Sequence, residues 1–251
     1  MTGGSEDVIV VDRLEKRFGD FTAVKGISFT VRRGEIFGFL GSNGSGKSTT
    51  IRMLCGIISP TSGSASVAGI DVVRRPEEVK RVIGYMSQKF SLYEDLTPVE
   101  NIRFYLGLYG VDPKRWDERI GWVIENAYLA DMKDRLTRDL PQGFRQRLAL
   151  GCALVHEPGI LFLDEPTSGV DPLTRRRFWD SIRALADQGV TVFVTTHYMD
   201  EAQNCSRIVM IDLGAVVAQG SPSEIVSGAC PGRPGARLED AFVALMGGGG
   251  R

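Results

Sequence analysis

A glycine-rich stretch carries the strongest chemical signal in the sequence. It follows an apolar segment that reads as a strand and opens a segment that reads as a helix, which is the setting a phosphate-binding loop requires. Glycines let backbone N–H groups turn inward toward phosphate oxygens, and the helix N-terminus adds the positive end of its dipole. The predicted nucleotide-binding residues of this loop are Gly41, Ser42, Asn43, Gly44, Ser45, Gly46, Lys47, Ser48 and Thr49.

Two side chains of this loop have distinct predicted roles. Lys47 would place a positive charge between the β- and γ-phosphates of a nucleoside triphosphate, and the Ser48 hydroxyl can ligate Mg²⁺. The alternative is a glycine-rich turn that binds nothing. The preceding strand, the glycine spacing, the lysine and the serine all favour phosphate binding over that alternative.

Two adjacent carboxylates form the second signal. Residues 160–163 are apolar and predict a strand, which delivers Asp164 and Glu165 at its end. Successive strand residues point to opposite sides, so the two carboxylates need not do the same work. Asp164 suits Mg²⁺ ligation, and Glu165 suits polarising the water that attacks the γ-phosphate. Carboxylates that merely cap the next turn are the alternative, which the nearby phosphate loop makes weaker.

The elements that must position these groups alternate along the chain. Strands are predicted at residues 8–14, 27–31, 35–40, 64–68, 81–86, 160–163, 190–195 and 207–211. Helices are predicted at residues 47–56, 98–106, 116–129, 144–155, 173–188 and 238–246. Thr97 with Glu100 predicts a capping box at the start of one of them. Alternating strands and helices predict a mostly parallel sheet covered on both faces, with a helical block inserted into it.

Composition argues against several other classes of protein. The 251 residues are 43% hydrophobic and 24% charged, which is typical of a soluble globular protein. Thirty basic and 31 acidic residues nearly cancel, so nucleic acid is not expected as a partner. The acidic, polar N-terminus is unlike a signal peptide, and apolar runs such as residues 148–155 are far shorter than the roughly 18 to 20 residues that span a bilayer. The chain is not expected to cross a membrane by itself.

The cysteines are widely separated and contain no Cys-x-x-Cys pair. Structural zinc usually needs such pairs, so reduced and mostly buried thiols are expected instead. The four positions are Cys55, Cys152, Cys205 and Cys230.

Taken together, these motifs resemble the nucleotide-binding subunits of ABC transporters over nearly the whole chain. Gln88 stands where that family's Q-loop glutamine contacts Mg²⁺ and water, and His197 matches the switch histidine that senses the γ-phosphate. Phe18 matches the aromatic residue that stacks on adenine, and Ser168–Asp171 matches the D-loop. Stacking selects a base poorly, so the resemblance implies ATP without strict exclusion of GTP.

The resemblance implies a role for each matched position. The implied catalytic residues are Glu165, His197, Lys47 and Gln88. The implied nucleotide contacts beyond the loop are Phe18, Gly143 and Asp171. The implied metal ligands are Ser48, Gln88 and Asp164. ATP and Mg²⁺ are therefore the expected ligands.

The resemblance also implies the fold. We expect an α/β P-loop NTPase with a mostly parallel sheet, an inserted helical subdomain and a small antiparallel N-terminal β part. Residues 1–95 and 156–230 would form the RecA-like core, and residues 96–155 would form the helical subdomain that carries the signature motif. A Gly/Pro-rich tail with one short helix would occupy residues 231–251.

The signature motif is where this sequence departs from the family pattern Leu-Ser-Gly-Gly-Gln. The aligned stretch is Leu140-Pro141-Gln142-Gly143-Phe144. Pro141 replaces the serine that would bind the γ-phosphate, and it offers neither a hydroxyl nor an N–H group. Either Gly143 and the N-terminus of the next helix still bind the anion, or the motif has lost that function.

Partners follow from the same resemblance. In the family, two subunits meet head to tail and each ATP lies between the P-loop of one and the signature of the other, an arrangement that suits a homodimer. A separately encoded transmembrane permease would hold the pair peripherally on the cytoplasmic face of the membrane. The segments that look most like multidrug and daunorubicin-resistance exporters are residues 23–29, 33–40, 195–202 and 238–242.

Two other functions are also consistent with the sequence. A soluble ABC-type ATPase acting on DNA or ribosomes would typically show two tandem copies or a long coiled coil, and this chain shows one copy with a compact insertion. A module that grips ATP without turnover is the second rival, and Pro141 is the residue that keeps it open.

Overall fold

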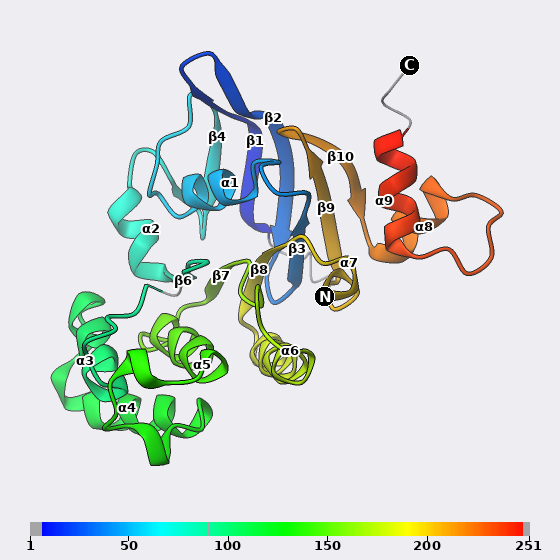
Figure 1. Cartoon of the computed structure of the whole chain (residues 1–251). Coiled ribbons are helices and arrows are strands. Elements are labelled where there is room, and N and C mark those ends of the chain that lie inside the picture. Colours follow the sequence, from blue (N-terminus) through cyan, green and yellow to red (C-terminus); the bar gives the residue numbers. More distant parts are fainter. Residues whose placement is uncertain (1–6, 90, 248–251) are drawn as a thin grey trace, which may run out of the picture.

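The computed structural model describes residues 7–89 and 91–247, which form two sheets and the helices around them (Figure 1). The strands are β1 (Asp7–Phe18), β2 (Phe21–Arg32), β3 (Ile36–Leu40), β4 (Ser62–Val67), β5 (Ile70–Asp71), β6 (Ile83–Met86), β7 (Ile160–Asp164), β8 (Thr191–Thr196), β9 (Arg207–Asp212) and β10 (Ala215–Gly220). The helices are α1 (Lys47–Leu54), α2 (Pro76–Val82), α3 (Pro98–Leu108), α4 (Trp116–Asn126), α5 (Gln142–Ala153), α6 (Pro172–Asp187), α7 (Met199–Ala202), α8 (Pro222–Ala229) and α9 (Leu238–Gly247).

The larger sheet has the strand order β10-β9-β3-β8-β7-β6. Its strands run parallel from β9 to β6, and β10 pairs antiparallel with β9 at one edge. The smaller sheet has the order β2-β1-β4-β5 and is antiparallel throughout. This confirms the expected α/β fold with a mostly parallel sheet and a small antiparallel N-terminal part.

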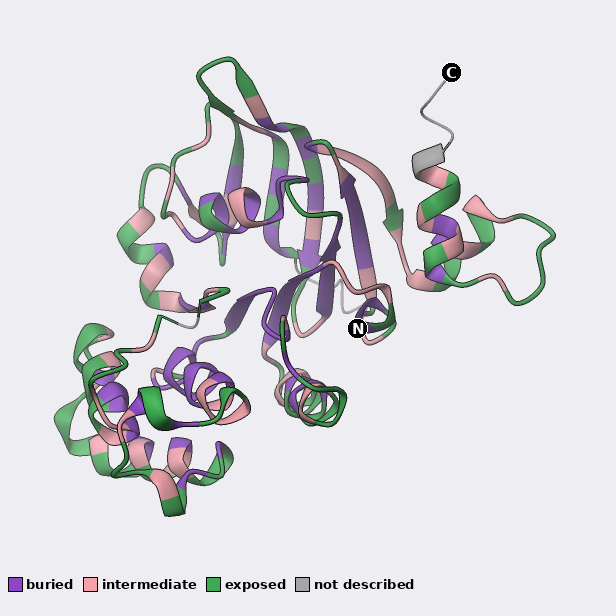
Figure 2. Cartoon of the chain, viewed as in Figure 1, coloured by how far each residue is buried: buried purple, intermediate pink, exposed green. Residues whose placement is uncertain are grey.

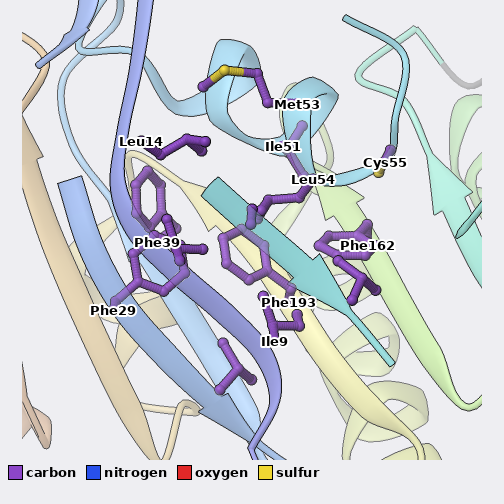
Figure 3. Packing of buried hydrophobic residues seen from close by; sticks show 14 of the residues in the cluster. Ile9, Leu14, Phe29, Phe39, Ile51, Met53, Leu54, Cys55, Phe162 and Phe193 are labelled. Carbon is purple, nitrogen blue, oxygen red and sulfur yellow. The ribbon is translucent and has the colours of Figure 1, made fainter. Parts of the chain in front are cut away.

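Strand β3 shows how the sequence builds the core. All five of its residues are buried, so both faces of the sheet must be covered. Phe37 and Phe39 face the smaller sheet, where they form one ring cluster with Phe29 and Phe193 at centroid distances between 5.5 and 6.1 Å. Phe162 packs on Phe193 at 5.4 Å, and Figure 3 shows both rings beside Phe29 and Phe39.

The opposite face of β3 belongs to a second cluster. Ile36 and Leu40 lie there with residues of α5, α6, α8 and α9. Buried residues accordingly run down the middle of the large sheet, while exposed ones lie on its surrounding helices (Figure 2). Strand alternation thus divides one short strand between two cores.

A third hydrophobic cluster joins α3, α4 and α5. Its fully buried members include Ile102, Leu106, Val123 and Leu148. Thr97 and Glu100 make the predicted capping box, with Thr97 N–H donating to Glu100 Oε2 over 2.8 Å. The other face of α5 contributes to the second cluster, so the helical block is fastened to the sheet through α5. The residue limits predicted for a separate helical subdomain stay a prediction.

Several elements differ from the sequence-based expectation. Helices α2 and α8 and strand β10 are additional, and each is only six to eight residues long. Short elements carry too few apolar positions for a periodic pattern. The predicted short helix near the end of the chain is confirmed as α9. Its residues Leu238 and Ala241 pack in the second cluster. The last glycines of the predicted tail, residues 248–250, lie outside the described residues.

Within the described residues, each helix is too short or too polar to serve as a bilayer-spanning segment. All four cysteines are free, and three of them are buried. Burial raises the pKa of the Cys152 and Cys205 thiols, which keeps them protonated and poorly reactive.

Two glycines provide a paired test of this packing. A Cβ at Gly84 in β6 would lie 2.3 Å from the carbonyl oxygen of Ala153, whereas a Cβ at Gly121 in α4 would meet nothing within 4 Å. We expect Gly84→Ala to lower the free energy of unfolding by about 1–3 kcal/mol. Gly121→Ala should raise it by about 0.5–1 kcal/mol, because it removes helix-interior glycine. Urea unfolding checks both, and equal effects would contradict the packing of α5 on β6.

Candidate functional site

The glycine-rich loop connects the carboxyl end of β3 to the start of α1. Its backbone passes close to neighbouring strands: a Cβ at Gly41 would lie 2.3 Å from Ile211 O, and one at Gly46 would lie 2.6 Å from Ala23 O. Gly44 and Gly46 also have positive φ angles of 81° and 105°. The glycines at these positions are therefore required by the path of the chain itself.

Lys47, the first residue of α1, turns its ammonium group back into the loop. Its Nζ donates to the carbonyl oxygens of Gly41 (2.9 Å) and Ser42 (3.0 Å). The same atom lies 3.0 Å from Oε1 of Glu165, and the two side chains are only 4% and 8% exposed. This buried ion pair joins the loop to the end of β7.

Asp164 occupies the last position of β7 and binds two hydroxyl groups. Ser48 Oγ donates to its Oδ1 over 3.1 Å, and Thr195 Oγ1 donates to the same atom over 2.8 Å. Burial raises the pKa of Asp164, while the hydrogen bonds from Thr195 and Ser48 oppose that shift.

Glu165 has an unusual backbone conformation. Its φ is 47°, a left-handed value that costs a non-glycine residue on the order of 1–3 kcal/mol. Its backbone N–H donates to Thr195 Oγ1 over 2.9 Å, which holds the residue in this conformation. From this conformation the side chain of Glu165 reaches Lys47.

Two further predicted residues meet the same carboxylate. Gln88 Nε2 donates to Oε2 of Glu165 over 3.2 Å, and His197 Nδ1 lies 3.2 Å from that oxygen. The His197 ring also packs on Tyr198, with the centroids 4.1 Å apart. Three segments that are distant in the sequence therefore converge on Glu165.

A cavity of about 410 Å³ opens beside this cluster. Its lining includes Gly44, Lys47, Ser48, Gln88 and Glu165. The volume suits a ligand of nucleotide size, because small-molecule sites range over roughly 300–1,000 Å³.

Two aromatic residues flank the cavity at the end of the β1–β2 hairpin. Phe18 is 51% exposed, and Lys16 Nζ lies 5.1 Å from its ring centroid. Phe21, its cross-strand partner, is 64% exposed and lines the same cavity. Sequence reasoning missed Phe21, although its position opposite Phe18 across a two-residue turn was a usable signal.

The signature segment and Asp171 lie elsewhere, around the starts of α5 and α6. Pro141 is the N-cap of α5, and a Cβ at Gly143 would lie 2.8 Å from Thr174 Cγ2 of α6. The Asp171 carboxylate caps α6 by accepting from the N–H groups of Leu173 and Thr174. Neither Gly143 nor Asp171 lines the cavity beside Lys47.

Thr195 is a second residue that sequence reasoning missed. It lies directly opposite Asp164 in the β7–β8 register, and it is fully buried. Its hydroxyl serves both members of the acidic pair. Only the strand register reveals this role, because a threonine inside a strand is otherwise an ordinary β-former.

The donors around Ser48 fit Mg²⁺. The Ser48 hydroxyl and the Asp164 carboxylate are adjacent oxygen ligands, the type that Mg²⁺ prefers. The described residues hold no group of three or more His, Cys, Asp or Glu side chains with metal-binding geometry. A site with so few protein ligands suits Mg²⁺, which is usually held by one or two protein groups, waters and substrate phosphates.

A parallel sheet with a glycine-rich loop and lysine after one strand, and an acidic pair on a nearby strand, defines a P-loop nucleotide-binding protein. A family model described as ABC transporter matches residues 24–168. The chain belongs to the ABC transporter family.

Relatives support this assignment. The chain is 49% identical over 242 residues to the probable multidrug ABC transporter ATP-binding protein YbhF of Escherichia coli (strain K12), covering 96% of the chain and 42% of that relative. It is 42% identical over 229 residues to the daunorubicin/doxorubicin resistance ATP-binding protein DrrA of Streptomyces peucetius, covering 91% of the chain and 69% of DrrA. The chain thus spans less than half the length of YbhF.

Solved structures agree with the fold. An ATP binding subunit of an ABC transporter superimposes with a TM-score of 0.85 at 28% identity, covering 95% of this chain and 99% of that one. The dimeric structure of MJ0796, a bacterial ABC transporter cassette, superimposes with a TM-score of 0.78 at 26% identity, covering 85% of this chain and 98% of that one.

Thr195→Val offers a test of the geometry around the acidic pair. Valine keeps the shape but removes the hydroxyl that accepts from the Glu165 N–H group over 2.9 Å, so that group keeps only the Thr195 carbonyl oxygen at 3.2 Å. It also takes one hydrogen-bond donor from Asp164. We expect the free energy of unfolding to fall by about 1–3 kcal/mol, measured by urea denaturation. Thr195→Ser, which retains the hydroxyl, should lose clearly less. Equal losses would show that the hydroxyl bonds contribute little.

Proposed function

We propose that the chain binds ATP and hydrolyses it to ADP and phosphate, and that this reaction powers a membrane exporter. The observation that carries the proposal is the convergence of Lys47, Gln88 and His197 on the Glu165 carboxylate beside a glycine-rich loop. An isolated phosphate-binding loop would need none of these contacts. Water attack on a phosphate needs a carboxylate base held in place, and these three contacts hold one.

The residues of the site would have distinct roles in ATP hydrolysis. The loop N–H groups, the start of α1 and Lys47 would hold the phosphates and stabilise the charge that develops on them. Glu165 would orient the attacking water and accept its proton, with His197 and Gln88 fixing the carboxylate and the water between them. Catalysis then consists mostly of positioning and charge stabilisation.

Magnesium would be held by Ser48, Gln88 and Asp164. When bound, the ion would neutralise phosphate charge and polarise the γ-phosphoryl group. Ser48 and Asp164 are already joined by a hydrogen bond of 3.1 Å, so two of these oxygen ligands lie side by side.

Phe18 would stack on the adenine ring at the open side of the cavity, with Phe21 as a second apolar surface beside it. Their exposure supports this role, because an adenine ring that covered these two large aromatic side chains would remove apolar surface from water. Stacking alone would leave the choice of ATP over GTP incomplete.

The proposed assembly contains two such chains and a permease. MJ0796, a relative in fold and sequence, is dimeric, and DrrA is named for daunorubicin and doxorubicin resistance. By analogy, Gly143 and the N-terminus of α5 would face the ATP of a second copy, and Asp171 would lie near the same interface. The permease would hold the pair on the cytoplasmic face of the membrane, and its substrate follows from the permease rather than from this chain.

Binding without turnover is the second candidate, and one observation favours it. Pro141 stands at the N-cap of α5 and brings no hydroxyl to the phosphate of a second copy. The backbone N–H groups at the start of α5 are the remaining donors there. Phosphate release by the purified protein separates the two candidates.

Lys47→Ala tests the assignment of the loop. Loss of the ammonium group should weaken ATP binding by roughly 10- to 100-fold, because a charged hydrogen bond to phosphate contributes roughly 1.5–3 kcal/mol. Isothermal titration calorimetry measures this. Lys80→Ala removes one charge from α2, outside the cavity, and should leave affinity unchanged. Unchanged affinity in Lys47→Ala would refute the loop assignment.

Glu165→Gln tests turnover. We expect phosphate release to fall roughly 100-fold or more, because the base for the attacking water is lost. The variant should retain ATP and accumulate as a dimer in size-exclusion chromatography with ATP and Mg²⁺. The control is Glu125→Gln, an exposed position on α4. A wild type no faster than Glu165→Gln would favour binding without turnover.

A further inference from the structure

Glu201 is a buried carboxylate outside the nucleotide cavity. It lies on the short helix α7 and is only 2% exposed. Thr167 Oγ1 donates to its Oε1, and Thr196 Oγ1 donates to its Oε2 over 2.7 Å. Arg175 Nε lies 3.5 Å from Oε1 and supplies the countercharge.

The two threonines belong to the two segments that carry the reacting groups. Thr167 lies two residues after Glu165, in the loop between β7 and α6. Thr196 is the last residue of β8 and directly precedes His197. Glu201 therefore joins the segment of Glu165 to the segment of His197 through one side chain.

The arginine adds a third element to this junction. Arg175 lies on α6, and its guanidinium group stacks over the Tyr198 ring at 4.3 Å. The same guanidinium donates to Val170 O over 3.5 Å. Helix α6 is thereby tied to the residues that follow both Glu165 and His197.

Helix α5 reaches the same loop from the other side. Gln146 Nε2 donates to Pro166 O over 2.6 Å, and Gln142 Nε2 donates to Ser168 O over 3.4 Å. A shift of α5 would consequently move the loop that follows Glu165. Glu201 is the side chain that would transmit this shift to His197.

A buried carboxylate restricts the positions of the groups that hydrogen-bond to it. Its charge is costly to bury unless each oxygen accepts strong hydrogen bonds, and charge-assisted bonds of this kind are about twice as strong as neutral ones. The Thr196 hydroxyl is fixed further, because its Oγ1 also accepts a hydrogen bond from the Tyr198 N–H over 3.0 Å. Glu201 thus helps to fix the separation of 3.2 Å between His197 Nδ1 and Glu165 Oε2, although it contacts neither residue's side chain.

We propose that Glu201 is a positioning residue that sets the geometry of the Glu165–His197 pair and couples it to α5, without touching the nucleotide. This proposal rests on the proposed ATP hydrolysis. It adds a residue that sequence motifs and the cavity lining leave unassigned.

Glu201→Gln is the direct test, and Asp200→Asn is its matched control. Both substitutions remove one carboxylate charge near Arg175, but Asp200 is exposed and lies 3.8 Å from Arg175. Glu201→Gln should lower kcat for phosphate release roughly tenfold or more, with KM for ATP within about twofold, since misplacement costs rate rather than binding. Asp200→Asn should resemble the wild type. Equal losses in both variants, or an unchanged kcat in Glu201→Gln, would overturn the proposal.

A double-mutant cycle separates positioning from general loss of structure. If Glu201 acts through His197, Glu201→Gln should reduce kcat little further in a His197→Ala background. A full additional loss in that background would overturn the proposal. Thr196→Ser should restore the kcat that Thr196→Val loses, because serine keeps the hydroxyl that reaches Glu201.

Hydrogen exchange tests the same idea without turnover. In Glu201→Gln the Tyr198 N–H should exchange at least several-fold faster than in the wild type or in Asp200→Asn, because Thr196 loses its anchored hydroxyl. Unchanged exchange would overturn the role of Glu201 even in an active enzyme. If the wild type released no phosphate, the proposed hydrolysis would fail, and faster exchange would still support Glu201 as the link between the two segments.

Discussion

The buried ion pair between Lys47 and Glu165 is the interaction on which the site depends. Its two residues are far apart in the sequence: Lys47 follows β3, and Glu165 follows β7. Removing one partner of a buried pair typically costs roughly 3–5 kcal/mol, because the other charge is left without compensation. The glycine-rich loop and the acidic pair are therefore positioned by each other. A fold that misplaced either strand would lose both.

Parallel strands make this meeting possible. Strand β8 lies between β3 and β7, and all three end at the same edge of the large sheet. The loop after β3, the carboxylates after β7 and His197 after β8 consequently share one edge, as expected for ligand sites of open α/β sheets. Buried hydroxyl–carboxylate hydrogen bonds then hold these segments in place. Thr195 donates to Asp164, and Thr196 donates to Glu201.

The sequence predicted the parts that carry a local pattern. The phosphate loop, the acidic strand end and the capping box at Thr97 each depend on neighbours within a few residues, and the fold class followed from alternating strands and helices. The roles of Thr195 and Glu201 could not be predicted from the sequence, because they arise from strand register and from a contact between a loop and helix α7, 34 residues apart. Roles for Gly143 and Asp171 depend on a second chain, so one chain's geometry leaves them as predictions.

A crystal structure with a non-hydrolysable ATP analogue and Mg²⁺ would show directly whether the nucleotide binds between the glycine-rich loop and Glu165. We expect the γ-phosphate at Lys47 Nζ, the metal at Ser48, and a water in line with the γ-phosphate at Glu165. The adenine should lie against Phe18. A nucleotide bound elsewhere, or a Glu165 carboxylate turned away from the γ-phosphate, would refute the proposed ATP site.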